Sequence, residues 1–187
     1  MKDGKPIVLI GFMATGKSTV GRILASDYGL EFVDLDEVVV SSAGMTIPDI
    51  FRIEGEESFR KRERAALLAT LGRANSVIAT GGGAACHLGN LDSMLAAGSV
   101  VALGVSAEEA IRRTGGDSGR PMLDGQGDRL TKARQLLEMR EPYYKQAHVR
   151  IETDGKMPAD IAFAVGTALG LRRDIHKEAA KNNEKES

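Results

Sequence analysis

The chain has 187 residues, a length typical of one domain with room for a sizeable hydrophobic core. Acidic and basic residues nearly balance at a formal net charge of −1, which gives no overall reason to expect nucleic acid or an anionic membrane as a partner. The single cysteine, Cys86, excludes an internal disulfide framework and favours a reducing cytoplasm. Because no apolar run approaches the length of a membrane span, we expect a cytoplasmic protein.

The chain begins with a strand, a glycine-containing loop and a helix. The apolar residues 7–10 predict a buried strand, and a helix is expected from Lys17 to about Asp27. Residues 11–18 between them read Gly-x-x-x-x-Gly-Lys-Ser, the P-loop pattern. In such a loop backbone N–H groups bind phosphate, the lysine contacts the β- and γ-phosphates, and the hydroxyl of Ser18 can reach Mg²⁺. The flanking strand and helix favour a nucleoside triphosphate site over an incidental glycine-rich turn.

The second predicted strand, residues 31–36, ends in two carboxylates. The carboxyl ends of parallel strands meet at one edge of a sheet, so Asp34 and Asp36 are expected near the P-loop, on one face of their strand. Asp34 is predicted to bind Mg²⁺, directly or through water, because a P-loop alone leaves the metal under-coordinated. Asp36 could instead do no more than cap the helix that follows.

A charged helix is predicted after residues 46–52, which read as a turn and a helix start with proline in the first turn. The mixed charges of residues 54–64 are typical of a solvated face, and residues 61–64, Glu63 among them, are expected in solvent. From sequence alone Arg60 could be another surface arginine.

The third predicted strand, residues 76–80, runs directly into three glycines at 81–83. Glycines at the carboxyl end of a strand allow unusual backbone angles and the close approach of a ligand, and we favour substrate contact over a flexible turn. Cys86 and His87 are predicted to begin the next helix, as a buried thiol and an exposed imidazole rather than as a metal pair.

The remaining elements complete an alternating pattern. We expect a strand at 99–105 and a helix at 106–113, then a helix at 128–140 that Pro142 stops or kinks, an edge strand at 148–152 and an amphipathic helix at 158–171. The glycine-rich residues 114–127 predict a mobile lid, with a plain disordered loop as the alternative. Residues 1–171 thus form one domain, an α/β fold with a five-stranded parallel sheet and helices on both faces, followed by a charged tail at 172–187 that is expected to be disordered.

The order of the motifs resembles that of the shikimate kinase family over about residues 6–170. The resemblance rests on the P-loop, Asp34-x-Asp36, Phe59-Arg60, the triple glycine, Arg120-Pro121 and Arg140-Glu-Pro-Tyr-Tyr. It implies a P-loop NTPase fold of three α/β/α layers. It also implies ATP-dependent phosphorylation of the shikimate 3-hydroxyl to shikimate 3-phosphate, a step of chorismate and aromatic amino-acid biosynthesis.

The resemblance further assigns roles to individual residues. It implies that the nucleotide is bound by Ala14, Thr15, Gly16, Lys17, Ser18, Thr19, Arg113, Arg120, Lys156 and Pro158, with Arg113 and Pro158 beside the adenine. It implies that shikimate is bound by Asp36, Arg60, Gly82 and Arg140, the two arginines holding its carboxylate. It implies catalytic roles for Lys17, Asp36 and Arg120, and Mg²⁺ binding by Ser18 and Asp34. The chief departure is Ala14, where many family members have glycine; if its φ is negative, we expect no loss of function.

Three alternatives differ in what the site recognises. Another small-molecule P-loop kinase, for gluconate or a nucleoside monophosphate, would share the loop, but a carboxylated polyol better suits Asp36, Arg60 and Arg140. A GTP-dependent switch would need a guanine-reading Asn-Lys-x-Asp, which the sequence lacks. A kinase-like protein without catalysis is disfavoured because every expected catalytic residue is present. The partners are therefore expected to be shikimate and ATP, with neither nucleic acid nor membrane, and the protein a monomer.

Overall fold

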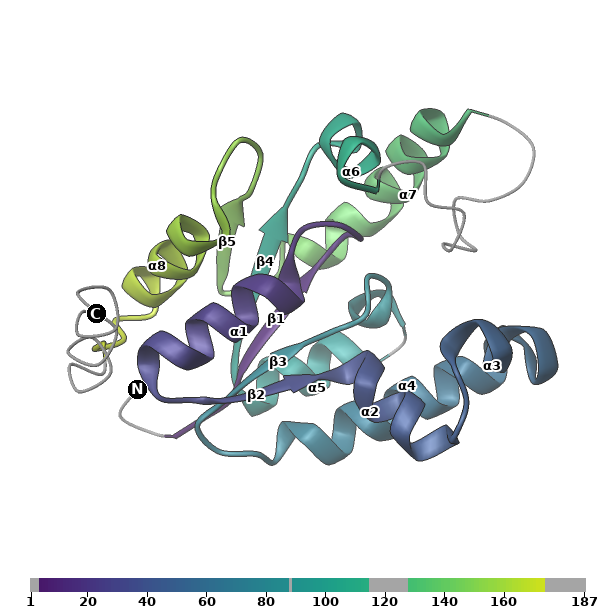
Figure 1. Cartoon of the computed structure of the whole chain (residues 1–187), viewed down its shortest axis with the longest axis horizontal. Coiled ribbons are helices and arrows are strands. Elements are labelled where there is room, and N and C mark those ends of the chain that lie inside the picture. Colours follow the sequence, from purple (N-terminus) through teal and green to yellow (C-terminus); the bar gives the residue numbers. More distant parts are fainter. Residues whose placement is uncertain (1–3, 88, 115–127, 174–187) are drawn as a thin grey trace, which may run out of the picture.

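The computed structural model describes residues 4–87, 89–114 and 128–173. Their five strands form one sheet in which every adjacent pair is parallel, in the order β2-β3-β1-β4-β5 (Figure 1). The strands are β1 Ile7–Gly11, β2 Glu31–Asp34, β3 Ser76–Ala79, β4 Ser99–Gly104 and β5 Val149–Glu152. The predicted five-stranded parallel sheet is thereby confirmed.

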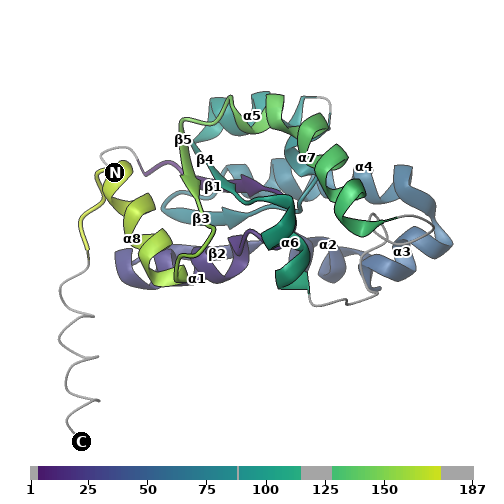
Figure 2. The same ribbon diagram turned by 90° about the horizontal axis from the view of Figure 1, so that it is seen from above.

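Helices cover both faces of the sheet, which gives the three predicted layers. The described helices are α1 Lys17–Tyr28, α2 Leu35–Ala43, α3 Ile47–Ile53, α4 Gly55–Leu71, the short 3₁₀ helix η1 Ala84–Cys86, α5 Asn90–Ala97, α6 Ala107–Thr114, α7 Arg129–Tyr144 and α8 Pro158–Ala168. Figures 1 and 2 show α1 and α8 together on one face and α4, α5 and α7 on the other. Each face has its own hydrophobic cluster.

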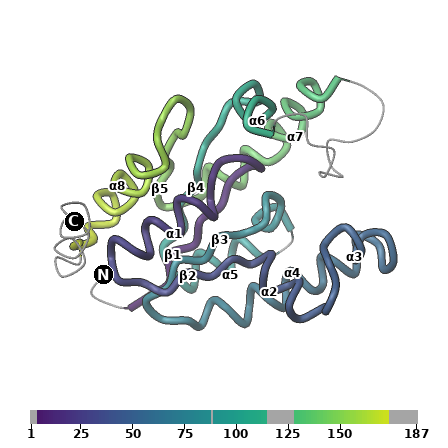
Figure 3. Tube along the Cα trace, in the orientation of Figure 1, coloured from purple at the N-terminus to yellow at the C-terminus, as the bar shows by residue number. Residues whose placement is uncertain are grey.

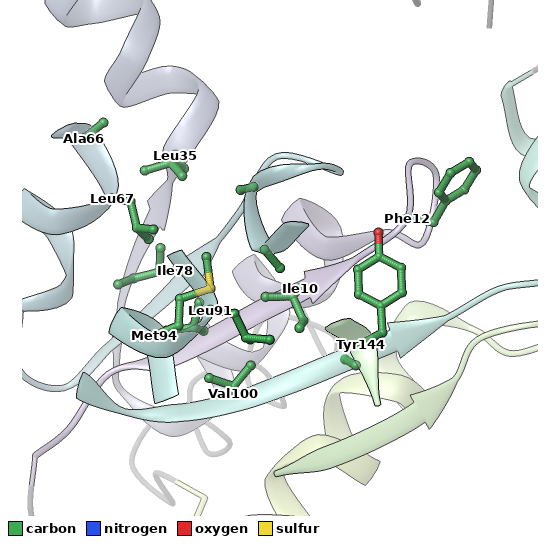
Figure 4. Packing of buried hydrophobic residues seen from close by; sticks show 14 of the residues in the cluster. Ile10, Phe12, Leu35, Ala66, Leu67, Ile78, Leu91, Met94, Val100 and Tyr144 are labelled. Atoms are coloured by element: carbon green, nitrogen blue, oxygen red, sulfur yellow. The ribbon is translucent and has the colours of Figure 1, made fainter. Parts of the chain in front are cut away.

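The central strand β1 contributes to both clusters. Ile7 and Leu9 pack towards α1 and α8, whereas Val8 and Ile10 belong to the larger cluster on the opposite face, part of which Figure 4 shows. All of β1 is buried, as expected of a parallel strand covered on both sides. In the Cα trace of Figure 3, β1 lies between β3 and β4 and leads straight through the loop into α1. Its carboxyl end is thus placed at the middle of the sheet edge where ligands bind in such folds.

The chain turns into α2 earlier than the sequence predicts. Asp34 ends β2 and acts as the N-cap of α2, its Oδ1 accepting a hydrogen bond from the backbone N–H of Asp36 at 3.1 Å. The helix begins at Leu35, so Asp36 lies in its first turn. The prediction that Asp34 and Asp36 share a strand face is therefore wrong, because a local cap at Asp34 competes successfully with continuation of the strand.

Two further helix boundaries differ from expectation. Pro142 lies inside α7, which continues to Tyr144 rather than ending at Arg140. A proline this near the carboxyl end removes only one late hydrogen bond, and the remaining turn is still held by packing of Tyr144, which is 5% exposed. Cys86 closes η1 instead of opening a helix, and α5 begins only at Asn90.

Several expectations lie outside the described residues. Apart from Thr114, which ends α6, the predicted lid falls in residues 115–127, and most of the predicted tail falls in residues 174–187. None of the helices in the described part of the chain combines the length and the apolar run that a bilayer crossing needs.

Candidate active site at the carboxyl edge of the sheet

The loop between β1 and α1 has the geometry of a phosphate cradle. Gly16 is the N-cap of α1 at φ +84°, a left-handed conformation that glycine adopts without strain. Thr15 closes the loop by donating from Oγ1 to the carbonyl of Phe12 at 3.0 Å. The ammonium of Lys17 lies within the loop and donates to the carbonyls of Gly11 at 2.9 Å and of Phe12 at 2.8 Å. The N–H groups that begin α1 and a lysine charge therefore face one small volume.

Ala14 departs from what the sequence leads us to expect. Its φ is +60°, so the premise of a negative φ is wrong. The carbonyl of Ala14 is bound by Arg113 of α6, whose Nη1 donates to it at 3.2 Å and to Thr153 Oγ1 at 3.1 Å. The carbonyl of Ala14 is directed to this guanidinium, which ties the P-loop to the segment after β5. An L-residue pays about 1–2 kcal/mol of strain in this conformation.

Replacing Ala14 with glycine is expected to stabilise the protein. Relief of the left-handed strain exceeds the extra chain entropy of glycine, for a net gain of about 0.5–1 kcal/mol and a rise of about 1–4 °C in Tm. Thermal unfolding of Ala14→Gly measures this gain. Ala43→Gly, in the last turn of α2, is the matched control and should lower Tm, because its conformation is helical. A fall of Tm in both variants would contradict the assigned strain.

A cavity of about 380 Å³ adjoins the P-loop and gathers most of the residues predicted to bind the nucleotide. Its lining includes Ala14, Thr15, Gly16, Thr19, Arg113, Lys156 and Pro158. Glu109 also lines it and holds Arg113 through a 2.8 Å ion pair with Nε; the hydrogen bonds from Arg112 and Arg113 lower the pKa of Glu109 to about 2. Sequence analysis did not place Glu109 or Thr153 in the site, where both accept hydrogen bonds from the guanidinium of Arg113.

Ser18 and Asp34 lie side by side, although they come from different elements. The Ser18 hydroxyl donates to Asp34 Oδ2 at 2.6 Å, while the other carboxylate oxygen caps α2. Because the serine proton is directed to the carboxylate, lone pairs of Oγ are left to face a cation. A hydroxyl and one carboxylate, completed by substrate phosphates and water, are the oxygen ligands that Mg²⁺ accepts. The residues present therefore fit the predicted metal.

The triple glycine serves close approach rather than unusual backbone angles, since none of its residues has a positive φ. A Cβ on Gly81 would lie 2.6 Å from Glu63 Oε1 and 3.1 Å from Asp36 Oδ1. A Cβ on Gly82 would lie 3.1 Å from the backbone nitrogen of Met13, within the P-loop. Any side chain at these two positions would push the acidic groups or the P-loop away. The expectation of unusual angles is wrong, and the predicted contact with substrate stays a prediction.

The carboxyl group of Asp36 is buried among several charged side chains. Burial and the neighbouring charge of Asp34 raise the pKa of its carboxyl group, while the charges of Lys17 and Arg60 oppose that rise. The charges of the P-loop lysine and of an arginine of α4 thus both act on this carboxylate, whose Oδ1 lies beside Gly81. Such a group can accept a hydrogen bond or a proton from a hydroxyl placed beside the P-loop.

Arg60 and Arg140 converge on the third glycine. A Cβ on Gly83 would lie 3.5 Å from Arg60 Nη1 and 3.5 Å from Arg140 Nη2. Arg60 is no free surface arginine: its side chain is 16% exposed and its guanidinium stacks 5.0 Å from the ring of Phe59. Two guanidinium groups that meet over one glycine are able to bind a carboxylate.

Glu63 holds Arg60 in this position, and the prediction that it is solvated is wrong. Its side chain is 1% exposed, and Oε2 accepts from Arg60 Nη1 at 2.9 Å. Burial raises the pKa of Glu63, and the charge of Arg60 opposes that effect. A signal was available in the sequence, because Glu63 falls four residues after Phe59 and four before the buried Leu67, on the apolar stripe of α4.

Arg140 and Tyr144 both reach the backbone of the triple glycine from α7. Arg140 is 8% exposed, donates from Nη1 to the Gly82 carbonyl at 3.0 Å, and lies 5.5 Å from the ring of Phe12. Tyr144 Oη donates to the same carbonyl at 2.9 Å. Sequence analysis assigned a role to Arg140 but none to Tyr144, the last residue of the same motif, which lies on α7 because the helix continues through Pro142.

One edge of the sheet thus collects nearly all the predicted site residues. The P-loop, Ser18 and Asp34 lie on the nucleotide side, and Asp36, Arg60, Gly82 and Arg140 lie next to them. Arg120 is the exception, since it lies outside the described residues. The arrangement can hold a triphosphate beside an acceptor that carries a hydroxyl and a carboxylate.

Known proteins of one family match most of the length of this chain. The family model of shikimate kinase matches residues 13–169. The shikimate kinase of Moorella thermoacetica is 45% identical over 163 residues, which are 87% of this chain and 93% of that protein. The shikimate kinase of Sulfurihydrogenibium is 39% identical over 90% of this chain and 99% of its own length.

Solved structures show the same relationship. The shikimate kinase from Acinetobacter baumannii in complex with shikimate has a TM-score of 0.85 at 39% identity, covering 90% of this chain and 94% of that one. A gluconokinase from Sinorhizobium meliloti, at 18% identity with a TM-score of 0.54 over 98% of each chain, shares the fold alone.

Proposed function

This chain belongs to the shikimate kinase family, and from that membership we propose where its two substrates bind and which residues act on them. The reaction is the ATP-dependent phosphorylation of shikimate in the shikimate pathway. The observation that carries the proposal is the triple glycine, because its three residues face the acidic pair, the P-loop and the two arginines in turn.

ATP lies in the cavity beside the P-loop. Its phosphates bind the N–H groups that begin α1 and the ammonium of Lys17, which exchanges carbonyl partners for phosphate oxygens. The adenine lies between Arg113 and Pro158, close to Lys156, on the lining of the cavity. Arg120, which lies outside the described residues, is the further cation proposed to bind the transferred group.

Shikimate lies between the triple glycine and α7. Its carboxylate pairs with the guanidinium groups of Arg60 and Arg140, and its ring lies against the backbone of Gly82. This orientation directs the ring hydroxyls to Asp36, which stands on the P-loop side of the site. The two charged ends of the site therefore fix the direction in which the substrate binds.

In the transfer step the 3-hydroxyl oxygen forms a bond to the γ-phosphorus as the bond from that phosphorus to the β,γ-bridging oxygen breaks. Asp36 orients the hydroxyl and accepts its proton, and Lys17 and Arg120 balance charge on the phosphoryl oxygens. Ser18 and Asp34 would hold Mg²⁺, which when bound neutralises phosphate charge.

The requirement for Mg²⁺ tests the proposed metal site of Ser18 and Asp34. Turnover with shikimate should fall to background when EDTA removes Mg²⁺, and Asp34→Asn should raise the Mg²⁺ concentration for half-maximal rate about tenfold. Asparagine caps a helix as well as aspartate does, so α2 keeps its N-terminus while the charge is lost. Asp92→Asn, at an exposed position in the first turn of α5, is the control. Full activity in EDTA, or an unchanged Mg²⁺ requirement in Asp34→Asn, would contradict the assignment.

We propose that the enzyme works as a cytoplasmic monomer. One chain supplies both the P-loop and the acceptor-binding residues, and its cysteine usage suits a reducing compartment. Sedimentation at assay concentration tests this proposal, and an active species that sediments as a dimer would contradict it.

A further inference from the structure

The carbonyl of Gly82 accepts two hydrogen bonds, and both donors come from α7. Arg140 Nη1 lies 3.0 Å from the carbonyl oxygen and Tyr144 Oη lies 2.9 Å from it. The donors are four residues apart, so they lie on one face of the helix. Because a carbonyl oxygen has two lone pairs, the pair of donors satisfies it fully and fixes the plane of the peptide group that follows Gly82.

The Tyr144 ring is held rigidly enough to impose that geometry. Its side chain is 5% exposed and belongs to the larger hydrophobic cluster, where Figure 4 shows it with Phe12 and Ile10 among the buried residues. The hydroxyl cannot turn to solvent without moving the ring. The donor is therefore preset by packing, whereas the longer arginine side chain depends on its partners to stay in place.

The hydroxyl also remains a donor under all ordinary conditions. Burial raises the pKa of the Tyr144 phenol. The phenol therefore keeps its proton and donates it to the Gly82 carbonyl at 2.9 Å.

We infer that Tyr144 is a positioning residue for shikimate, which holds the Gly82 carbonyl and the Arg140 guanidinium in the arrangement that receives the substrate carboxylate and ring. The inference rests on the proposed place of shikimate between Gly82 and Arg140. Without the phenol, a single hydrogen bond would leave both the peptide group and the guanidinium free to turn. The loss is therefore expected for shikimate and not for ATP, because Gly82, Arg140 and Tyr144 are not part of the lining of the ATP cavity.

The test is Tyr144→Phe, which keeps the ring and removes only the hydroxyl. We expect kcat/KM for shikimate to fall about fivefold to tenfold, mainly through KM, the effect of one lost hydrogen bond. KM for ATP should stay within twofold of wild type. Tyr143→Phe, on the neighbouring and 37% exposed tyrosine, is the matched control and should leave both KM values unchanged. The rise in Tm on adding saturating shikimate gives a second measure of binding.

The outcomes separate this inference from the proposed function. If Arg140→Ala raises KM for shikimate and Tyr144→Phe does not, shikimate lies where proposed and the role of Tyr144 is overturned. If Tyr144→Phe raises both KM values in parallel, the residue is merely structural and the inference fails. If Arg140→Ala and Tyr144→Phe both leave KM for shikimate unchanged, the proposed place of shikimate fails, and the inference with it. A selective rise in both variants supports the inference.

Discussion

Replacement of Asp36 with asparagine is expected to lower kcat about 10²- to 10⁴-fold while ATP binding survives. Asparagine is nearly isosteric but neither accepts a proton nor carries the charge that orients the shikimate hydroxyl. Asp36 lies in the first turn of α2, next to Gly81 rather than within the ATP cavity. The variant should therefore bind nucleotide with an affinity close to that of wild type. Single-turnover rates and a direct titration with ATP measure the two quantities separately.

A matched control is needed because the loss of any carboxylate from the first turn of a helix could weaken that helix. Asp92 occupies the first turn of α5 and is exposed, so Asp92→Asn loses the same favourable interaction with its helix dipole and should retain full kcat. Unchanged turnover in Asp36→Asn would remove Asp36 from the catalytic step. A loss of ATP affinity as large as the loss of kcat would instead place it in the nucleotide site.

Replacement of Arg140 with alanine is expected to raise KM for shikimate at least about 30-fold, with little change for ATP. The guanidinium is 8% exposed, and removal of a desolvated charge partner costs about 2 kcal/mol or more. Arg140→Lys should recover only part of the affinity, because lysine keeps the charge but not the two-pronged hydrogen bond. Initial rates with each substrate varied in turn give both KM values.

Arg134 on the same helix provides the control. It is exposed and pairs with Glu108, so Arg134→Ala should leave both KM values near wild type. If Arg140→Ala instead raised KM for ATP as much as KM for shikimate, the carboxylate-binding role would be contradicted. A lower Tm common to Arg140→Ala and Arg140→Lys, without any change in KM, would show that Arg140 serves only folding.

The predictions from sequence were right where residues that are contiguous in the chain determine the structure. The P-loop was predictable because glycine spacing, lysine and the flanking elements are contiguous. The alternation of apolar runs likewise predicted the five-stranded sheet. The contact between Ser18 and Asp34 followed from the rule that parallel strands bring their carboxyl ends together. The helix cap, however, was expected at Asp36 and is formed by Asp34.

The errors arose where tertiary packing decides the outcome. Glu63 belongs to a run of charges that reads as solvated, yet it lies on the apolar stripe of α4 and pairs with a buried arginine. Tyr144 depends on a helix that continues past a proline. The left-handed conformation of Ala14 is a backbone property that its side chain disfavours, and it is coupled to Arg113 from a distant helix. Ala14 and Arg113 are far apart in the chain, as are Tyr144 and Gly82, so no window of local sequence contains either pair. For Glu63, by contrast, the spacing from Phe59 and Leu67 was a local signal.

The most direct test of the central claim is ADP release from Mg·ATP, measured with shikimate, gluconate, a panel of nucleoside monophosphates, and no acceptor. The account predicts turnover that depends on shikimate and on Mg²⁺, with the other acceptors at the level of the control. Turnover with gluconate or a nucleotide in place of shikimate would keep the P-loop assignment and contradict the carboxylate site of Arg60 and Arg140. ATP binding without turnover on any acceptor would contradict the assigned kinase activity itself.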